Sequence, residues 1–173
     1  MLFRSVDSMS DIVWAIDPEN DRLHDLAQRM RWFGGEVFQA RDIQFEFSGP
    51  AQREDTTLRA DLRREVFLVF KEAVNNIARH AGCRHVRAGL AIEGELLLLT
   101  LADDGRGFDA DSAASGLGLK SMRQRARRLG GAIEIASRPQ NGAAIILSVP
   151  WRRRPLWKTF LHRRIGERRQ DSA

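Results

Sequence analysis

Apolar residues recur with the spacing of an α-helix in two parts of this 173-residue chain. From about Asp21 they stand at i, i+3, i+4 and i+7, which predicts a helix with one buried face. A longer helix is predicted over residues 58–80, and one side of it gathers the polar residues Glu72, Asn75, Asn76, Arg79 and His80. A third helix is predicted from the 116–119 segment to about Leu129, where Gly130-Gly131 closes it.

Strands are predicted between these helices. Residues 43–47 alternate apolar and polar side chains, as a half-buried strand does. Residues 85–92 and 95–102 form a predicted strand pair turned by Glu93-Gly94. Residues 132–137 and 143–149 form a predicted hairpin, turned by 139–142.

The run Asp103-Asp104-Gly105-Arg106-Gly107-Phe108 directly follows the apolar strand at 96–101. Taken alone, such a run is typical of a surface turn. A carboxylate there could instead accept a hydrogen bond from the exocyclic amine of a base, and the glycines would let backbone approach a flat ring. The sequence on either side decides between these interpretations.

Two other segments would each have a role if the bound nucleotide were ATP. Adjacent asparagines are poor helix formers, but Asn76 offers a neutral oxygen to Mg²⁺ and Arg79 on the same face could reach a phosphate. Gly116 and Gly118 precede a helix, where free N–H groups can cradle phosphates. Loop 109–115 could close over the nucleotide as a lid. Together the three segments predict that Asp103 reads adenine.

Composition and charge narrow the class of protein. One cysteine, Cys83, excludes an internal disulfide framework, and no apolar run approaches the roughly 18 residues of a membrane span. Residues 151–173 hold eight Lys and Arg against two Asp and Glu, whereas residues 1–150 hold 20 against 21. The basic character therefore belongs to the tail, and the body has no excess charge that would indicate nucleic-acid binding.

The three segments resemble the ATPase domain shared by DNA gyrase, the large heat-shock chaperone, sensor histidine kinases and the MutL mismatch-repair protein. Residues 72–79 are similar to its N box, 103–107 to its first glycine box and 116–119 to its second. Residues 70–81 and 116–126 most resemble the histidine-kinase branch that includes the nitrate and lipid-desaturation sensors. The resemblance implies an α/β two-layer sandwich, with a mixed β-sheet packed against helices.

The resemblance also implies a function. The domain would bind Mg²⁺ and ATP and pass the γ-phosphoryl to a histidine on a dimerisation domain that is absent here, from which a response regulator would take it. Full-length members form homodimers, and this part would lie in the cytoplasm. The implied ATP-binding residues are Asn76, Arg79, His80, Asp103, Gly105, Gly107, Gly116, Leu117, Gly118 and Leu119, with Asn76 also binding the metal.

Two of these side chains have alternative roles. Glu72 would either activate the attacking group as a base or only orient the metal shell. His80 would either line the pocket or cap the helix. The other histidines have no such role: His24 stands beside an acid, as a phosphoacceptor does, but lies too few residues before Asn76, and His85 and His162 are expected to be plain surface residues.

The predicted division of the chain is 1–42 for the end of a dimerisation helix and a linker helix, 43–150 for the ATP-binding domain, and 151–173 for a disordered basic tail. Residues 10–18 resemble the join after the second dimerisation helix in kinases with a periplasmic propeller sensor, so the chain is expected to be a catalytic fragment or a stand-alone module. An amphipathic helix is the alternative for the tail, but Arg164 and Arg168 would fall inside its apolar arc. An anionic lipid or an acidic partner remains its alternative ligand.

Two other functions fit the same fold. An anti-sigma-factor-like serine kinase needs no dimerisation domain, but it leaves residues 10–18 unexplained. A non-enzymatic module would hold ATP and act through the tail.

Overall fold

The computed structural model describes residues 21–50, 56–109 and 117–152. The predicted join at 10–18, the tail beyond Arg152 and nearly all of the predicted lid lie outside these ranges. The elements, in chain order, are α2 (Leu23–Gln39), β1 (Gln44–Ser48), α3 (Ala60–Asn76), the π-helical turn η2 (Ile77–Ala81), β2 (His85–Glu93), β3 (Leu96–Asp103), α5 (Leu117–Arg128), β4 (Ala132–Ser137) and β5 (Ala143–Pro150).

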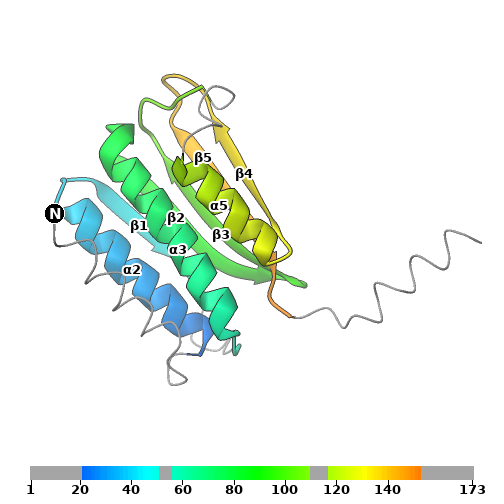
Figure 1. The fold of residues 1–173 in the computed structure, drawn as a ribbon. Coiled ribbons are helices and arrows are strands. Elements are labelled where there is room, and N and C mark those ends of the chain that lie inside the picture. Colours follow the sequence, from blue (N-terminus) through cyan, green and yellow to red (C-terminus); the bar gives the residue numbers. More distant parts are fainter. Residues whose placement is uncertain (1–20, 51–55, 110–116, 153–173) are drawn as a thin grey trace, which may run out of the picture.

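The strands form one five-stranded sheet in the order β1-β2-β3-β5-β4 (Figure 1). β1 runs parallel to β2, and the other neighbouring strands are antiparallel. A parallel pair needs a long crossover connection, which α3 supplies between β1 and β2. The sheet is therefore mixed, as predicted.

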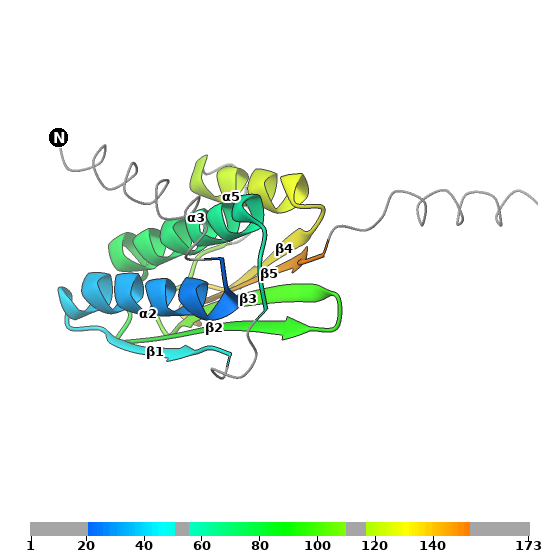
Figure 2. The ribbon, with the colours of Figure 1, turned by 90° about the horizontal axis from the view of Figure 1, so that it is seen from below.

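Helices α2, α3 and α5 all lie on one face of the sheet (Figure 2). The fold is thus the predicted two-layer α/β sandwich. Alternate residues along each strand point to the helices: Leu97, Leu99 and Leu101 of β3 are almost fully buried, whereas Leu96 and Thr100 are exposed. This period of two is what a sheet covered on one face requires.

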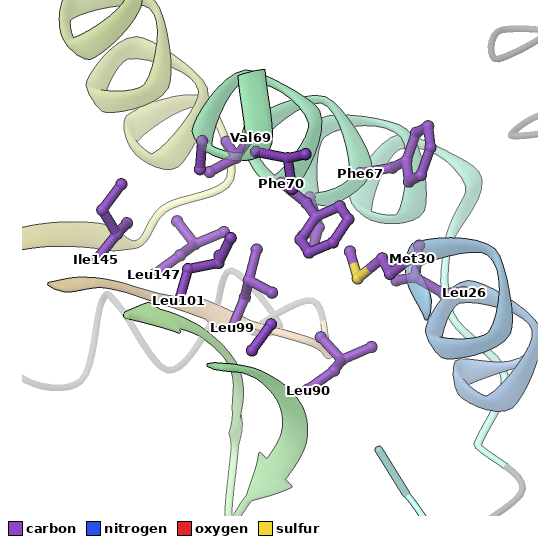
Figure 3. Packing of buried hydrophobic residues seen from close by; sticks show 14 of the residues in the cluster. Leu26, Met30, Phe67, Val69, Phe70, Leu90, Leu99, Leu101, Ile145 and Leu147 are labelled. Carbon is purple, nitrogen blue, oxygen red and sulfur yellow. The ribbon is translucent and has the colours of Figure 1, made fainter. Parts of the chain in front are cut away.

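The hydrophobic core fills the space between the two layers (Figure 3). Phe70 of α3 is fully buried, as are Leu99 of β3 and Leu147 of β5. Leu26 and Met30 of α2 belong to the same cluster. Residues 23–39, which the predicted division assigns to a linker helix, thus share one core with the sheet; the boundary at residue 42 stays a prediction.

The long helix predicted over residues 58–80 changes its geometry near its end. Its α-helical part stops at Asn76, and the chain continues through η2 to Gly82, whose φ of +60° ends the helix. A π-turn closes i to i+5 hydrogen bonds, so each residue advances by a smaller angle than in an α-helix. Side chains beyond Asn76 are therefore rotated relative to the predicted positions.

A partly buried ion pair joins α5 to α3. Nη1 of Arg125 lies 2.7 Å from Oε2 of Glu65, and the Glu65 side chain is only 11% exposed. A carboxylate buried to this degree needs a cationic or hydrogen-bonding partner, because water no longer solvates it. The pair therefore fixes the helix that follows the predicted lid against the helix that carries Asn76.

Arg125→Ala should lower the free energy of unfolding by about 2 kcal/mol, because it leaves the Glu65 carboxylate buried with less compensation. This is less than the roughly 3–5 kcal/mol of a fully buried pair, since the Arg125 side chain is 25% exposed. Urea denaturation measures the change. Arg127→Ala, an exposed position on the same helix, is the control and should stay within about 0.5 kcal/mol of the parent; equal effects would contradict a role for the pair.

Candidate nucleotide-binding site

A cavity of about 480 Å³ opens between the helix layer and the ends of β3 and β5. A cavity of this volume is in the range that holds small-molecule ligands. It is lined by Ala73, Asn76, Ile77, His80, Ala81, Leu101, Asp103, Arg106, Gly107, Phe108, Leu117, Gly118, Leu119, Ala143 and Ile145. Most of these side chains are apolar, and a few polar groups stand among them. That combination suits a flat ring with a polar edge.

Asp103 lies at the end of β3, where the buried strand enters the cavity. Its Oδ1 accepts a hydrogen bond from the amide of Gly105 at 2.9 Å. Burial raises the pKa of this carboxyl, and the backbone amides of Gly105 and Ala143 partly oppose the rise. A carboxyl that is costly to bury is held here in an otherwise apolar wall, which is the pattern of a group that recognises a ligand.

The loop after Asp103 is tied to two other parts of the chain. The amide of Arg106 donates to the carbonyl of Ala81 at 2.8 Å, and the amide of Gly142 donates to the carbonyl of Gly105 at 2.8 Å. Gly107 has a φ of +58°, and a Cβ at this position would overlap the carbonyl oxygen of Arg138. The glycine is therefore required by both its conformation and the close backbone approach.

Asn76 and Glu72 stand one turn apart on α3, and Gly118 of α5 packs against both. A Cβ on Gly118 would overlap Oε1 of Glu72 and would lie 3.2 Å from Nδ2 of Asn76. The missing side chain leaves room between these two oxygen-bearing groups and the start of α5. Free N–H groups at a helix start favour anions.

These residues fit Mg²⁺ as a partner of a bound phosphate. The described part of the chain holds no group of three or more His, Cys, Asp or Glu that could bind a metal alone. Mg²⁺ commonly uses one or two protein oxygens and completes its shell with water and phosphate oxygens. The Asn76 amide oxygen, with Glu72 nearby, is a donor set of that kind.

Comparison with protein families decides the class of the fold. A family model described as histidine kinase-, DNA gyrase B- and HSP90-like ATPase matches residues 61–153. The chain belongs to this family. The match confirms the resemblance drawn from the three motifs, and it includes every described residue that lines the cavity.

Relatives of this ATPase-family chain include sensor kinases. It is 35% identical over 98 residues to the sensor histidine kinase LiaS of Bacillus subtilis, covering 56% of this chain and 27% of LiaS. It is 34% identical over 113 residues to the sensor protein VraS of Staphylococcus haemolyticus, covering 65% of this chain and 30% of VraS. The chain therefore spans less than a third of the length of these relatives.

Solved structures share the fold of this ATPase-family chain. The histidine kinase domain of a blue-light activated kinase from Erythrobacter litoralis matches with a TM-score of 0.61 at 20% identity, covering 73% of this chain and 61% of that one. The histidine kinase AdeS of Acinetobacter baumannii matches with a TM-score of 0.63 at 12% identity, covering 86% and 77%. Within the described residues, no helix of the ATPase-family chain has the length and apolar character needed to cross a bilayer.

The structure brings together most of the residues predicted to bind ATP in this ATPase-family chain. Those that line the cavity are Asn76, His80, Asp103, Gly107, Leu117, Gly118 and Leu119. Gly105 is buried beside the Ala81 carbonyl and does not belong to the described cavity wall. Gly116 lies outside the described residues.

Arg79 and His80 are both exposed, but only His80 belongs to the described cavity wall. The π-turn explains the difference, because its smaller angle per residue rotates Arg79 farther from the face of Asn76, whereas His80 stays on that face. The cavity-lining position of His80 agrees with the first of its two alternative roles. Its assignment to ATP stays a prediction, as does that of Arg79.

Several wall residues of the ATPase-family chain were not predicted as site residues. Arg106 and Phe108 line the cavity from the glycine loop, and Ala143 and Ile145 line it from β5. The period-two pattern of β5 places Ile145 on the helix-facing side, which was the available signal. The position of Ala143 and Ile145 in the wall depends on the pairing of β5 with β3. The sequence pattern does not determine this pairing.

Asp104, the second acid of the motif, makes a different set of contacts. Its Oδ1 accepts from the amides of Arg84 and His85 at 2.8 and 2.9 Å, and its Oδ2 lies 2.7 Å from Nδ1 of His85. The prediction that His85 is a plain surface residue is therefore incomplete: it is exposed, but it pairs with Asp104. The sequence shows no sign of this pair, because His85 and Asp104 are far apart along the chain. The antiparallel pairing of β2 with β3 brings them together.

The Asp104 contacts predict a pH dependence for the stability of the ATPase-family chain. Hydrogen bonds from His85 and from the Arg84 amide lower the pKa of Asp104 from 3.8 to about 2. Because the folded pKa lies below the unfolded one, the contribution is present above pH 3.8 and lost as the pH falls toward 2. Asp104→Asn should flatten thermal stability across this acid window, as followed by circular dichroism; an unchanged slope would contradict the contribution of this carboxylate.

Proposed function

We propose that this domain binds Mg²⁺ and ATP in the cavity and passes the γ-phosphoryl group to a histidine on a dimerisation domain. One observation carries the proposal: Asp103 and the glycine loop line the same cavity as Asn76 and the start of α5, and Gly118 lies against both Asn76 and Glu72. The first set suits a base, and the second suits a triphosphate and its metal. The distribution matches the polarity of ATP.

Adenine would lie among the apolar side chains that line the wall. The Asp103 carboxylate would accept a hydrogen bond from the exocyclic amine, while its Oδ1 stays fixed by the Gly105 amide at 2.9 Å. An acceptor that is already fixed loses little conformational entropy when the ligand binds, and this favours affinity. The apolar walls from Ile77, Leu101 and Ile145 would exclude water from the ring faces.

The phosphates would lie between α3 and the start of α5. Asn76 would contribute an oxygen to Mg²⁺, which when bound neutralises charge on the phosphate oxygens. Glu72, close to both Asn76 and Gly118, would position the metal shell or accept the proton of the attacking imidazole. In the transfer, an imidazole nitrogen forms a bond to the γ-phosphorus, the bond to the β–γ bridging oxygen breaks, and ADP leaves.

The wider setting follows from the relatives and belongs to the same proposal. LiaS is named a sensor histidine kinase, and such kinases pass their phosphoryl group to a response regulator. We place this chain in that role as the catalytic part of a homodimer, on the cytoplasmic side of a membrane-anchored kinase.

A phosphotransfer assay tests the proposal. The full chain, Mg²⁺ and ATP labelled at the γ-phosphate would be mixed with separately supplied dimerisation helices of a sensor-kinase relative. Acid-labile label on the histidine of those helices is the expected result. Acid-stable label on a serine of an added partner would instead support the serine-kinase alternative, and ATP binding without any transfer would support a binding module; either outcome overturns the histidine-kinase assignment.

A further inference from the structure

Figure 2 shows that all the helices drawn in colour lie on one side of the sheet. The opposite face of the sheet carries exposed apolar residues. Leu96 and Ile146 are 39% and 42% exposed, and they belong to β3 and β5, which both have a neighbouring strand on each side. The residues that share this face around them form the outer patch: Ala91, Leu96, Leu98, Ala132, Ile146 and Pro150. Within the described residues no helix covers this face, so the patch has no partner there.

The strand register places Ala91, Leu96, Leu98 and Pro150 next to one another, whereas polar residues lie between these four and the rest of the outer patch. Leu96 pairs with Pro150, and Leu98 stands between Ala91 and Ser148. Ile146 pairs with Thr100 on one side and with Glu134 on the other. Apolar residues grouped on neighbouring strands in this way favour a contact site over scattered exposure.

The chain leaves the described fold at the border of the outer patch. The amide of Trp151 donates to the carbonyl of Glu95 at 3.3 Å, and its indole Nε1 donates to the carbonyl of Gly94 at 3.0 Å. These bonds fasten the end of β5 to the turn between β2 and β3. The last described residues, Trp151 and Arg152, therefore directly follow the pairing partner of Leu96, the first residue of the patch along β3.

The segment that follows matches the outer patch in chemistry. Residues 155–161 read Pro-Leu-Trp-Lys-Thr-Phe-Leu, with apolar side chains at i, i+1, i+4 and i+5 that would share one side of a helix. Charge is complementary too. The acidic residues beside the patch are Glu93, Glu95 and Glu134. The basic residues are Lys158 within the segment and Arg153 and Arg154 directly before it.

The segment is also long enough to reach. An extended chain advances at most about 3.3–3.6 Å per residue, so the four steps from Arg152 to Leu156 cover up to about 14 Å. The four steps along β5 from Pro150 to Ile146 cover about the same distance. Residues from Leu156 onward can therefore lie over Leu96 and Leu98, and Phe160 can reach Ile146.

We infer that residues 155–161 fold back and pack against the outer patch of the same molecule. Leu156, Trp157, Phe160 and Leu161 supply the apolar contact, and the flanking bases meet the acids at the patch border. The sequence pattern favours a disordered tail because Arg164 and Arg168 fall inside the apolar arc of a helix, but both lie beyond residues 155–161. The outer patch provides an apolar surface that residues 155–161 can cover.

Crosslinking tests the contact in the full chain. In a Cys83→Ala background, which removes the single native thiol, Ile146→Cys is combined with Phe160→Cys and treated with a short bismaleimide. A crosslinked monomer is expected. The control pairs Phe160→Cys with Gln124→Cys on the exposed side of α5, across the sheet from the patch, and should give no crosslinked monomer.

Other occupants of the patch would give different results. A crosslinked dimer in place of the monomer would mean that a second copy covers the patch. Equal crosslinking of both cysteine pairs would mean a tail that contacts the surface at random. Sedimentation with vesicles of equal parts phosphatidylglycerol and phosphatidylcholine, without a crosslinked monomer, would mean that the segment binds a membrane. Each of these overturns the inference.

Thermal unfolding of chains that keep Cys83 gives an independent check, in case the cysteine-free background folds poorly. Ile146→Ser and Phe160→Ser should each lower the unfolding midpoint, and the double variant should lose less than the sum, because both remove one contact. Ile146→Ser combined with Trp32→Ser, an exposed position on α2, should be additive. Additive loss in the first pair would contradict the contact.

Discussion

Asp103→Asn should weaken ATP binding by about 10- to 100-fold while the protein remains folded. A hydrogen bond to a charged group contributes about 1.5–3 kcal/mol, and each 1.4 kcal/mol is about tenfold in affinity. The asparagine keeps an oxygen for the Gly105 amide, whose hydrogen bond to Oδ1 is 2.9 Å long. The loop should therefore stay in place, and the loss should fall on the ligand. Isothermal titration calorimetry with ATP measures it.

The neighbouring Asp104→Asn is a matched control for this prediction. It makes the same chemical change one residue along, on a carboxylate that bonds to Arg84 and His85 and does not line the cavity. ATP affinity at neutral pH should be close to that of the parent. If Asp103→Asn leaves affinity unchanged, or if both variants lose it equally, the assignment of Asp103 to the base is wrong.

Gly107→Ala should both destabilise the protein and abolish ATP binding. A residue with a Cβ costs about 1–2 kcal/mol in the left-handed region that Gly107 occupies at a φ of +58°. The added Cβ would also overlap the carbonyl oxygen of Arg138, and such overpacking costs roughly 1–3 kcal/mol more. Because Gly107 lines the cavity, the forced shift of the loop reshapes the wall. Urea denaturation and calorimetry with ATP measure the two effects.

Gly130→Ala separates the two causes of this loss. Gly130 also has a positive φ, of +74°, but no atom lies within 4 Å of an added Cβ. It closes α5 away from the described cavity wall, so the alanine should cost only the conformational part and leave ATP affinity intact. Equal destabilisation by the two alanines would show that the close approach at Gly107 adds nothing.

Much of this fold was predictable because its elements carry strong local patterns. Helix α2 was predictable from the helical spacing of its apolar residues, and β3 from its apolar run. The glycine loop after Asp103 was predictable from its residue types. The resemblance then supplied the arrangement of the layers. Asn76, Asp103 and Gly118 lie in or around one cavity because each stands at the end of an element that the motifs already placed.

What the sequence did not predict depends on local geometry or on contacts between distant residues. The π-turn at Ile77–Ala81 has no signature in the spacing of its apolar residues, so Arg79 was expected beside Asn76 and His80, whereas only Asn76 and His80 line the cavity. The pairing of His85 with Asp104 and of Arg125 with Glu65 requires the strand register and the packing of α5 on α3. Such contacts are set by tertiary structure, which a single sequence shows only indirectly.

The strand order has a consequence for how the chain folds. Hairpins β2–β3 and β4–β5 join strands that are neighbours along the chain, so their loops close quickly. The pairing of β1 with β2 and of β3 with β5 bridges long intervening segments, and closing such segments costs more entropy before contacts repay it. Because the cavity wall draws on α3, β3 and β5 together, it is complete only after the second of these slow pairings. A nucleotide can therefore bind and stabilise the completed fold, but it cannot stabilise the earlier folding steps.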